Sequence, residues 1–384
     1  MKKIFFGSFF LLLSLPALAD FYPTHYLESR EYLQKSFENL KLQFPKAELT
    51  PLPVNKDKNL FIDALYIPAQ EAKKALVIVT SGIHGVEAFT GSALIFSFLK
   101  QMTSEQLQGT GFLFIHAVNP YGYHQLRRVS ANNIDLNRNF SASKVQFKSF
   151  SPDYKDFEDY LNPTHPLNSS WWSDSLLFLK SLYKLAVFGK KKITQVAVGG
   201  QYQNPKGIYF GGTELEPHVS LLKNEFLRVG QDYKRVLHMD LHTGYGQRGR
   251  LHFFSSYEVV HSPDFQKVFA GFTIDYAQDK DFYETSGSFG QFTVETFPDK
   301  SVVPMTLEFG TLDSQTILGG FFSLRNMIYE NQGFHYGYAN PTSQSRSQRQ
   351  FLEMFNPSDP KWRKQVLKTG VETMKTLSQR FSQL

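Results

Sequence analysis

The sequence predicts an α/β fold, in which one large domain contains a central, mixed and mostly parallel twisted sheet flanked by helices. Two observations support this prediction. Apolar segments of strand length alternate with longer segments of helical spacing, and the strand-like segments end in loops rich in polar residues. The expected strands are 60–67, 75–80, 111–118, 235–244 and 302–310, and the expected helices include 88–102, 176–188, 215–229 and 362–384.

The first residues predict export. Two lysines precede an apolar run over residues 4–15, and Ala-Leu-Ala at 17–19 has the small-x-small pattern of a signal-peptidase site. This run is shorter than the roughly 20 apolar residues that a membrane-spanning helix needs. We therefore expect a signal peptide over residues 1–19, cleavage after Ala19, and a periplasmic or secreted protein without stable membrane insertion.

The rest of the chain is expected to form a main domain over residues 20–335, with an insertion at about 141–230 and a helical tail, 336–384, packed on it. Residues 20–59 have helical spacing until Pro51 and Pro53 predict a break. Within the insertion, Trp171 and Trp172 are interpreted as core or lid packing, because aromatic side chains readily fill cores.

Charge and cysteine content exclude several functions. The sequence has 41 Lys and Arg against 35 Asp and Glu, and loss of the two signal-peptide lysines leaves 39 − 35 = +4. The basic residues are scattered among acids, so no nucleic-acid partner is expected, although a weak attraction to anionic surfaces remains.

The absence of cysteine excludes disulfides and thiolate metal sites, so stability must come from a core. The sequence leaves the oligomeric state undetermined.

Three residues at strand ends predict a metal site. His84 and Glu87 follow the strand 75–80, and a carboxylate three positions after an imidazole can share one cation with it. His242, at the end of the strand 235–244, supplies a third ligand. The carboxyl ends of strands in an open α/β sheet are where ligands bind. Two imidazoles and one carboxylate leave zinc one open position, which is typical of a catalytic site.

Two further stretches add chemistry. Glu308 lies near the end of the apolar strand 302–310, where a carboxylate needs a partner or a function, and it could act as a general base for a zinc-activated water. The loop 126–140 carries arginines and asparagines that suit carboxylate binding, although an ordinary solvated loop has the same composition. Together these residues predict a zinc-dependent hydrolase.

Six ordered motifs carry a family resemblance. These are SGIHGVE, NPYG, DLNRNF, DLHTGYGQ, FYETSGSFG and TLEFG, which lie between about residues 60 and 312. In this order they are similar to the motifs of zinc metallocarboxypeptidases and of the related succinylglutamate desuccinylase/aspartoacylase family.

The resemblance implies a role for each matching residue. It assigns one zinc ion to His84, Glu87 and His242, and the general base and acid to Glu308. Asp135 matches the aspartate that hydrogen-bonds a zinc histidine, and either Arg127 or Arg128, with Arg128 preferred, matches the arginine that holds the oxyanion. The residues that match the group recognising the substrate's free carboxylate are Asn137, Arg138 and Tyr283.

Three functions remain open on this reading. The first is an exported zinc carboxypeptidase, which Asn137, Arg138 and Tyr283 together favour. The second is an amidohydrolase that deacylates a small N-acyl amino acid, as the aspartoacylase side of the resemblance allows. The third is an inactive binding module on the same fold, which would most simply lack a ligand or the base. In the first two, the expected substrate is a peptide or an N-acyl amino acid with a free carboxylate.

Overall fold

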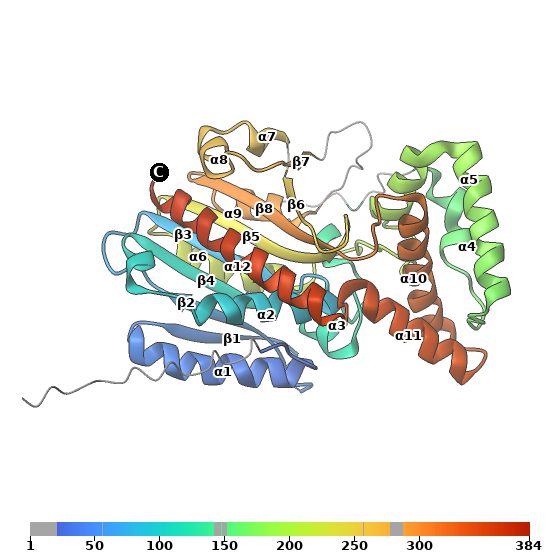
Figure 1. Cartoon of the computed structure of the whole chain (residues 1–384), viewed down its shortest axis with the longest axis horizontal. Coiled ribbons are helices and arrows are strands. Elements are labelled where there is room, and N and C mark those ends of the chain that lie inside the picture. Colours follow the sequence, from blue (N-terminus) through green and yellow to red (C-terminus); the bar gives the residue numbers. More distant parts are fainter. Residues whose placement is uncertain (1–20, 56, 142–146, 148–151, 256, 277–286) are drawn as a thin grey trace, which may run out of the picture.

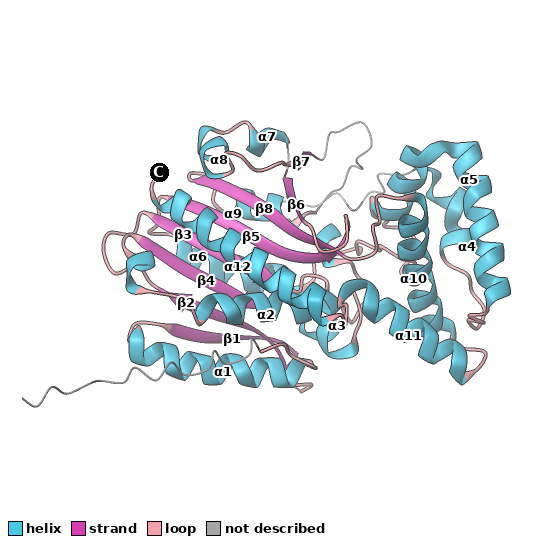
Figure 2. Ribbon diagram, viewed as in Figure 1, coloured by secondary structure: helices cyan, strands magenta, loops and turns pink. Residues whose placement is uncertain are grey.

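A computed structural model describes residues 21–55, 57–141, 147, 152–255, 257–276 and 287–384. Its centre is a twisted sheet of eight strands in the order β1-β2-β4-β3-β5-β8-β6-β7 (Figures 1 and 2). The strands are β1 Glu48–Asn55, β2 Leu60–Ile67, β3 Ala75–Ser81, β4 Thr110–His116, β5 Arg235–Gly244, β6 Leu251–Ser255, β7 Asp275–Tyr276 and β8 Ser301–Gly310. This arrangement confirms the predicted fold class.

The middle of the sheet is parallel, and this fixes where a site can form. Strands β4, β3, β5 and β8 run in the same direction, whereas β1, β2 and β6 run antiparallel to their neighbours β2, β4 and β8. The carboxyl ends of the four parallel strands therefore meet at one edge. The loops after β3 and β4 and the last residues of β5 and β8 all lie there.

Helices cover both faces of the sheet, and the alternation of each strand decides which side chains they meet. Val77 and Val79 of β3 join a core with α2 Ala88–Leu99 and α12 Pro360–Ser382. Leu76 and Ile78 face the opposite core, which includes α6 Pro217–Gly230 and α9 Phe289–Thr296. Another long helix beside the sheet is α1 Tyr26–Gln43.

A second group of helices extends away from the sheet (Figure 1). It contains α4 Glu158–Leu161, α5 Trp171–Val198, α10 Ile317–Tyr336 and α11 Pro341–Phe355, with an apolar cluster of its own. The shorter helices are α3 Pro120–Gln125, α7 Tyr257–Val260 and α8 Pro263–Val268, and the 3-10 turns are η1 Gly85–Glu87, η2 Ser104–Leu107, η3 Leu136–Arg138 and η4 Pro152–Phe157. The predicted division into insertion, domain and tail stays a prediction, and its last boundary falls at the end of α10.

Two expectations from the sequence are wrong. The helical stretch expected up to Pro51 and Pro53 ends earlier, at Gln43, and both prolines lie in β1, because β1 is an edge strand and an edge position tolerates a residue without an N–H donor. Trp171 and Trp172 do not pack in a core, because 65% and 75% of their surfaces are exposed at the start of α5.

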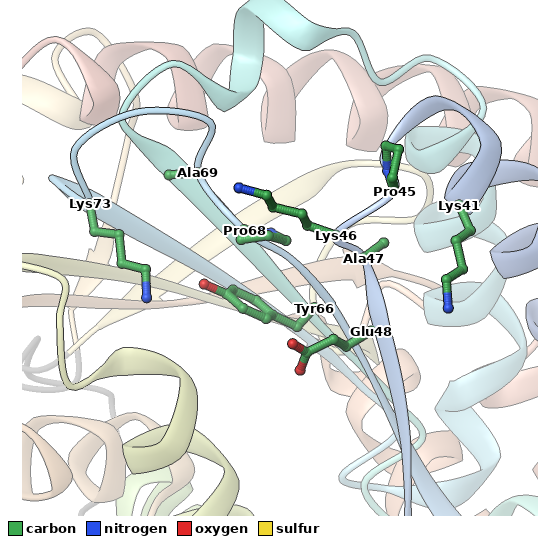
Figure 3. Close-up of a pocket in the computed structure, with 9 residues that line it drawn as sticks. All are labelled: Lys41, Pro45, Lys46, Ala47, Glu48, Tyr66, Pro68, Ala69 and Lys73. Atoms are coloured by element: carbon green, nitrogen blue, oxygen red, sulfur yellow. The ribbon is translucent and has the colours of Figure 1, made fainter.

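A surface hollow of about 550 Å³ lies at the opposite edge of the sheet from the carboxyl ends of the parallel strands (Figure 3). Lys41, Lys46, Glu48, Tyr66 and Lys73 are among its lining residues. Tyr66 stands near the end of β2, opposite the beginning of β4, so this hollow is separate from the strand ends that carry the predicted ligands. Among the residues described, no helix has the length and apolar character needed to cross a membrane.

Candidate metal centre

His84 and Glu87 are brought together by a tight turn after β3. His84 precedes η1 and Glu87 ends it, so that His84 Nδ1 lies 2.8 Å from Glu87 Oε1. Gly85 makes the turn possible, because a Cβ at this position would lie 2.1 Å from the backbone of Gly122. The Gly85 N–H also donates to the carbonyl of Arg128, which ties this turn to the loop after β4.

His242 reaches the same point from β5. Its Nδ1 atom lies 3.0 Å from Glu87 Oε2, and the next backbone N–H, that of Thr243, donates to the same oxygen. Within the part of the chain that the structure describes, His84, Glu87 and His242 are the one group of three or more His, Asp or Glu side chains that could hold a metal ion. Their ligand atoms lie within 4.8 Å of one another, and all three side chains are buried.

Each imidazole has a carboxylate on its far side. Asp135 Oδ1 lies 3.2 Å from His84 Nε2, and Asp240 Oδ2 lies 2.7 Å from His242 Nε2. A carboxylate in this position fixes the tautomer, so that the Nε2 atom carries the proton and the Nδ1 atom presents its lone pair to the centre. The donor set of two Nδ1 atoms and one carboxylate therefore fits zinc.

Asp240 was missed by the sequence analysis. It is held by Thr80, whose hydroxyl donates to Asp240 Oδ1 at 2.6 Å and also lies 2.9 Å from His238 Nε2. Thr80 and Asp240 are register partners on β3 and β5. The signal was present in the sequence, because residues two apart on a strand share one face and Asp240 is two residues before His242.

The electrostatic field at the centre favours a cation. Burial alone would lower the pKa of His242, but Asp240 and Glu87 beside it raise that pKa well above its usual value. Burial would raise the pKa of Asp135, whereas Arg128 and His84 hold it well below its usual range. The centre thus contains buried carboxylates that stay ionised and stabilise positive charge between them.

Glu308 lies beside this group on β8. It is the register partner of His242, and its Oε2 atom is 4.0 Å from His242 Nδ1. The Oε1 atom accepts the Tyr245 N–H at 2.9 Å, which fixes the orientation of the carboxyl group. Burial, followed by the nearby charge of Glu87, raises the pKa of Glu308 to about 7. A carboxyl group with such a pKa can take up and release a proton near neutral pH.

The structure separates the two candidate arginines. Arg128 lies at the centre, where it donates from Nη1 to Glu87 Oε1 at 3.3 Å and from Nη2 to Asp135 Oδ2 at 3.1 Å. Arg127 lies away from the metal ligands, because it pairs with Glu330 on α10 at 2.6 Å and stacks over the Phe334 ring.

Two of the three residues expected to hold a substrate carboxylate, Asn137 and Arg138, lie in η3, directly after Asp135. Asn137 accepts the Phe289 N–H at its Oδ1 atom, and its own N–H donates to Asp135. Arg138 is buried, and two of its N–H groups donate to the carbonyls of Asn137 and Val198. Tyr283 lies outside the described residues.

Comparison with known proteins identifies the family. The family described as "Protein of unknown function (DUF2817)" matches residues 22–369, which is most of the chain. The chain belongs to the DUF2817 family. No curated protein matches the sequence.

Several solved structures are similar to this DUF2817 protein. Carboxypeptidase A from Helicoverpa armigera is 15% identical, with 84% of this chain and 73% of that chain covered and a TM-score of 0.43. Bovine thrombin-activatable fibrinolysis inhibitor, in complex with tick carboxypeptidase inhibitor, is 14% identical, with 92% and 98% covered and a TM-score of 0.43. Murein-tripeptide amidase MpaA from Escherichia coli O157 is 17% identical, with 70% and 86% covered and a TM-score of 0.34.

Proposed function

We propose that this DUF2817 protein is a zinc-dependent hydrolase that cleaves an amide bond next to a free carboxylate, most simply as a carboxypeptidase. One observation carries the proposal: two imidazole Nδ1 atoms and a buried glutamate converge beside Glu308, a second carboxyl group with a pKa of about 7. An assembly of this kind provides both a metal site and a proton acceptor within one cluster.

The residues have distinct tasks in the reaction. When bound, zinc supplies Lewis acidity, which polarises a carbonyl group and lowers the pKa of water. Glu308 takes the proton of the attacking water and returns it to the leaving nitrogen as the carbon–nitrogen bond breaks. Arg128 presents a fixed positive donor where negative charge develops on the carbonyl oxygen. Asp135 and Asp240 keep the two imidazoles in the orientation that binds the metal.

Substrate recognition is assigned to Arg138 and Asn137, with Tyr283 as a third contact. A guanidinium presents five N–H donors in a planar arrangement that suits a carboxylate, and two of the N–H groups of Arg138 donate to the carbonyls of Asn137 and Val198. The substrate is then a peptide or an N-acyl amino acid with a free carboxylate. We also assign export to the chain, with Asp20 as the first residue after cleavage, which the intact mass of the secreted protein tests.

The deciding experiment uses zinc-loaded mature protein. Short peptides and N-acyl amino acids, each as the free acid and as the carboxamide, are incubated with it, and products are read by mass spectrometry. We expect cleavage of free acids that is much faster than cleavage of amides, because an amide leaves Arg138 without its anionic partner at a cost of about 2–5 kcal/mol if the pair is buried. Release of single C-terminal residues identifies a carboxypeptidase, and cleavage of acyl amino acids alone identifies a deacylase.

Two results would contradict the proposal. Equal cleavage of acids and amides would refute carboxylate anchoring while keeping a zinc hydrolase. Absence of any turnover with full zinc occupancy would favour the inactive binding module, although all three ligands and Glu308 are assembled.

A further inference from the structure

The outward face of α5 is apolar, the opposite of what a surface helix presents to water. The face consists of Trp172, Leu176, Leu179, Leu182, Tyr183 and Val187, and all six are exposed. Their spacing of three or four residues places them on one side of the helix. Trp172 is 75% exposed, Leu179 62% and Tyr183 67%. We call these six residues the α5 face.

The other side of α5 is already used for packing. Phe178 contacts Phe321 of α10 with ring centroids 4.9 Å apart, and the Ser181 hydroxyl lies 2.6 Å from the Tyr160 hydroxyl. Phe188 contacts Phe157 before the helical geometry breaks at Gly189. The α5 face is therefore the side of the helix opposite the one that packs on its own domain.

The position of α5 makes the α5 face accessible to a broad surface. The helix forms the outermost layer of the molecule at the end remote from α1, with α4 and α10 behind it (Figure 1). Helix α10 packs against α5 through Phe321, and its first turn also carries the exposed side chains of Ile317 and Leu318. Such a projecting apolar surface marks an interaction site rather than ordinary surface composition.

The charges around this face indicate the kind of partner. Helix α5 carries five lysines and a single acid, Asp174. Lys184 lies over the Phe157 ring and Lys192 pairs with Asp153, whereas the lysines at 180, 190 and 191 are exposed. Asp174 pairs with Arg325 and Arg346 of the neighbouring helices and so is directed away from the α5 face. A second copy of this face would bring its exposed lysines together, and the one carboxylate of α5, that of Asp174, is already paired with arginines. An anionic surface is complementary to both the apolar side chains and the lysines.

We propose that the α5 face docks the protein on an anionic lipid surface, as an interfacial helix that lies on the membrane without crossing it. Tryptophan and leucine side chains enter the boundary between headgroups and acyl chains, and the flanking lysines meet anionic headgroups.

Vesicle binding by the mature chain tests this proposal without any dependence on metal or turnover. Sedimentation is compared for vesicles of phosphatidylcholine alone and with added phosphatidylglycerol. We expect binding mainly to the anionic vesicles. The combined variant Trp172→Ser, Leu179→Ser, Tyr183→Ser should lower it by about tenfold or more, since three exposed apolar side chains are lost. The matched control is Leu42→Ser, an exposed leucine on α1, which should bind as wild type does.

The lysine contribution has its own test and control. Lys180→Gln with Lys191→Gln should weaken binding to anionic vesicles by about fivefold for each lysine. Lys364→Gln with Lys368→Gln, on α12, should leave binding to anionic vesicles unchanged.

Sedimentation velocity of the protein without lipid distinguishes docking on lipid from self-association. A dimer that the triple variant converts to a monomer, with no vesicle binding by wild type, would overturn the proposal and assign the α5 face to contact between copies. Equal vesicle binding by wild type and the triple variant would also overturn it.

Discussion

Replacing Asp240 by asparagine tests whether the carboxylate behind His242 supports metal binding. The change keeps the size of the side chain and removes its charge. Asparagine can still accept the His242 Nε2 proton with its amide oxygen, and Thr80 can still bond to His238, so the fold should be retained. The loss is then confined to the charge that favours a cation at the centre.

The size of the effect follows from the geometry. The contact is charge-assisted, 2.7 Å long and buried, and such a hydrogen bond contributes about 1.5–3 kcal/mol. Loss of a partner that orients a metal ligand costs about 10–100-fold in metal affinity, which is about 1.4–2.7 kcal/mol and agrees with the first figure. We expect zinc affinity to fall by that factor, and we expect the metal-free variant and the metal-free wild type to unfold with the same cooperativity.

The assay is a competition titration against a zinc-binding dye, with urea unfolding of the metal-free and zinc-loaded forms. Asp232→Asn is the matched control, because Asp232 is an exposed aspartate that also has one ion-pair partner, Lys73. It should leave zinc affinity unchanged. Equal zinc affinity in Asp240→Asn and wild type would refute the role assigned to Asp240. Equal destabilisation of the two forms would show that Asp240 stabilises the fold alone.

Two further predictions concern the metal centre, and a third concerns a buried histidine outside it. Asp135→Ala should weaken zinc binding by about 10–100-fold in the same titration, and an unchanged affinity would refute its role. Glu308→Gln should retain zinc but lower turnover by about 10²–10⁴-fold, because an amide cannot accept a proton; near-normal turnover at full zinc occupancy would move the base elsewhere. Burial lowers the pKa of His116 from 6.5 to about 4, so below pH 6.5 the unfolded chain binds a proton that the native state does not. Stability should therefore fall between pH 6.5 and 4, by up to about 1.4 kcal/mol per pH unit from this group; in urea titrations His116→Gln should flatten that slope, and an unchanged slope would assign it to other groups.

Strand patterns and strand ends made much of the site predictable. His84, Glu87, His242 and Glu308 follow or end strands that the sequence shows as apolar runs, and the parallel order of those strands brings them together. The choice between neighbouring arginines was harder, because adjacent residues in a loop point in different directions that only the fold determines. Arg128 reaches Asp135, and Arg127 reaches Glu330, more than two hundred positions along the chain.

Other features depend on packing that local patterns do not contain. Pro51 and Pro53 lie in a strand because nothing pairs with the outer edge of β1 in the described sheet. The tryptophans at 171 and 172 look like core residues from their chemistry, yet the helix that carries them docks through its opposite side. Asp240 was visible in principle, since strand alternation alone places it on the same side as His242.

Zinc content is the measurement that tests the central claim most directly. Wild type, His242→Ala and Glu308→Gln are stripped with a chelator, reloaded with zinc, freed of excess metal, and measured by mass spectrometry of the element together with hydrolysis of a free-acid peptide. The account predicts one zinc per chain and restored hydrolysis for wild type, zinc without hydrolysis for Glu308→Gln, and greatly weakened zinc binding for His242→Ala. Full zinc retention and hydrolysis by His242→Ala would contradict it.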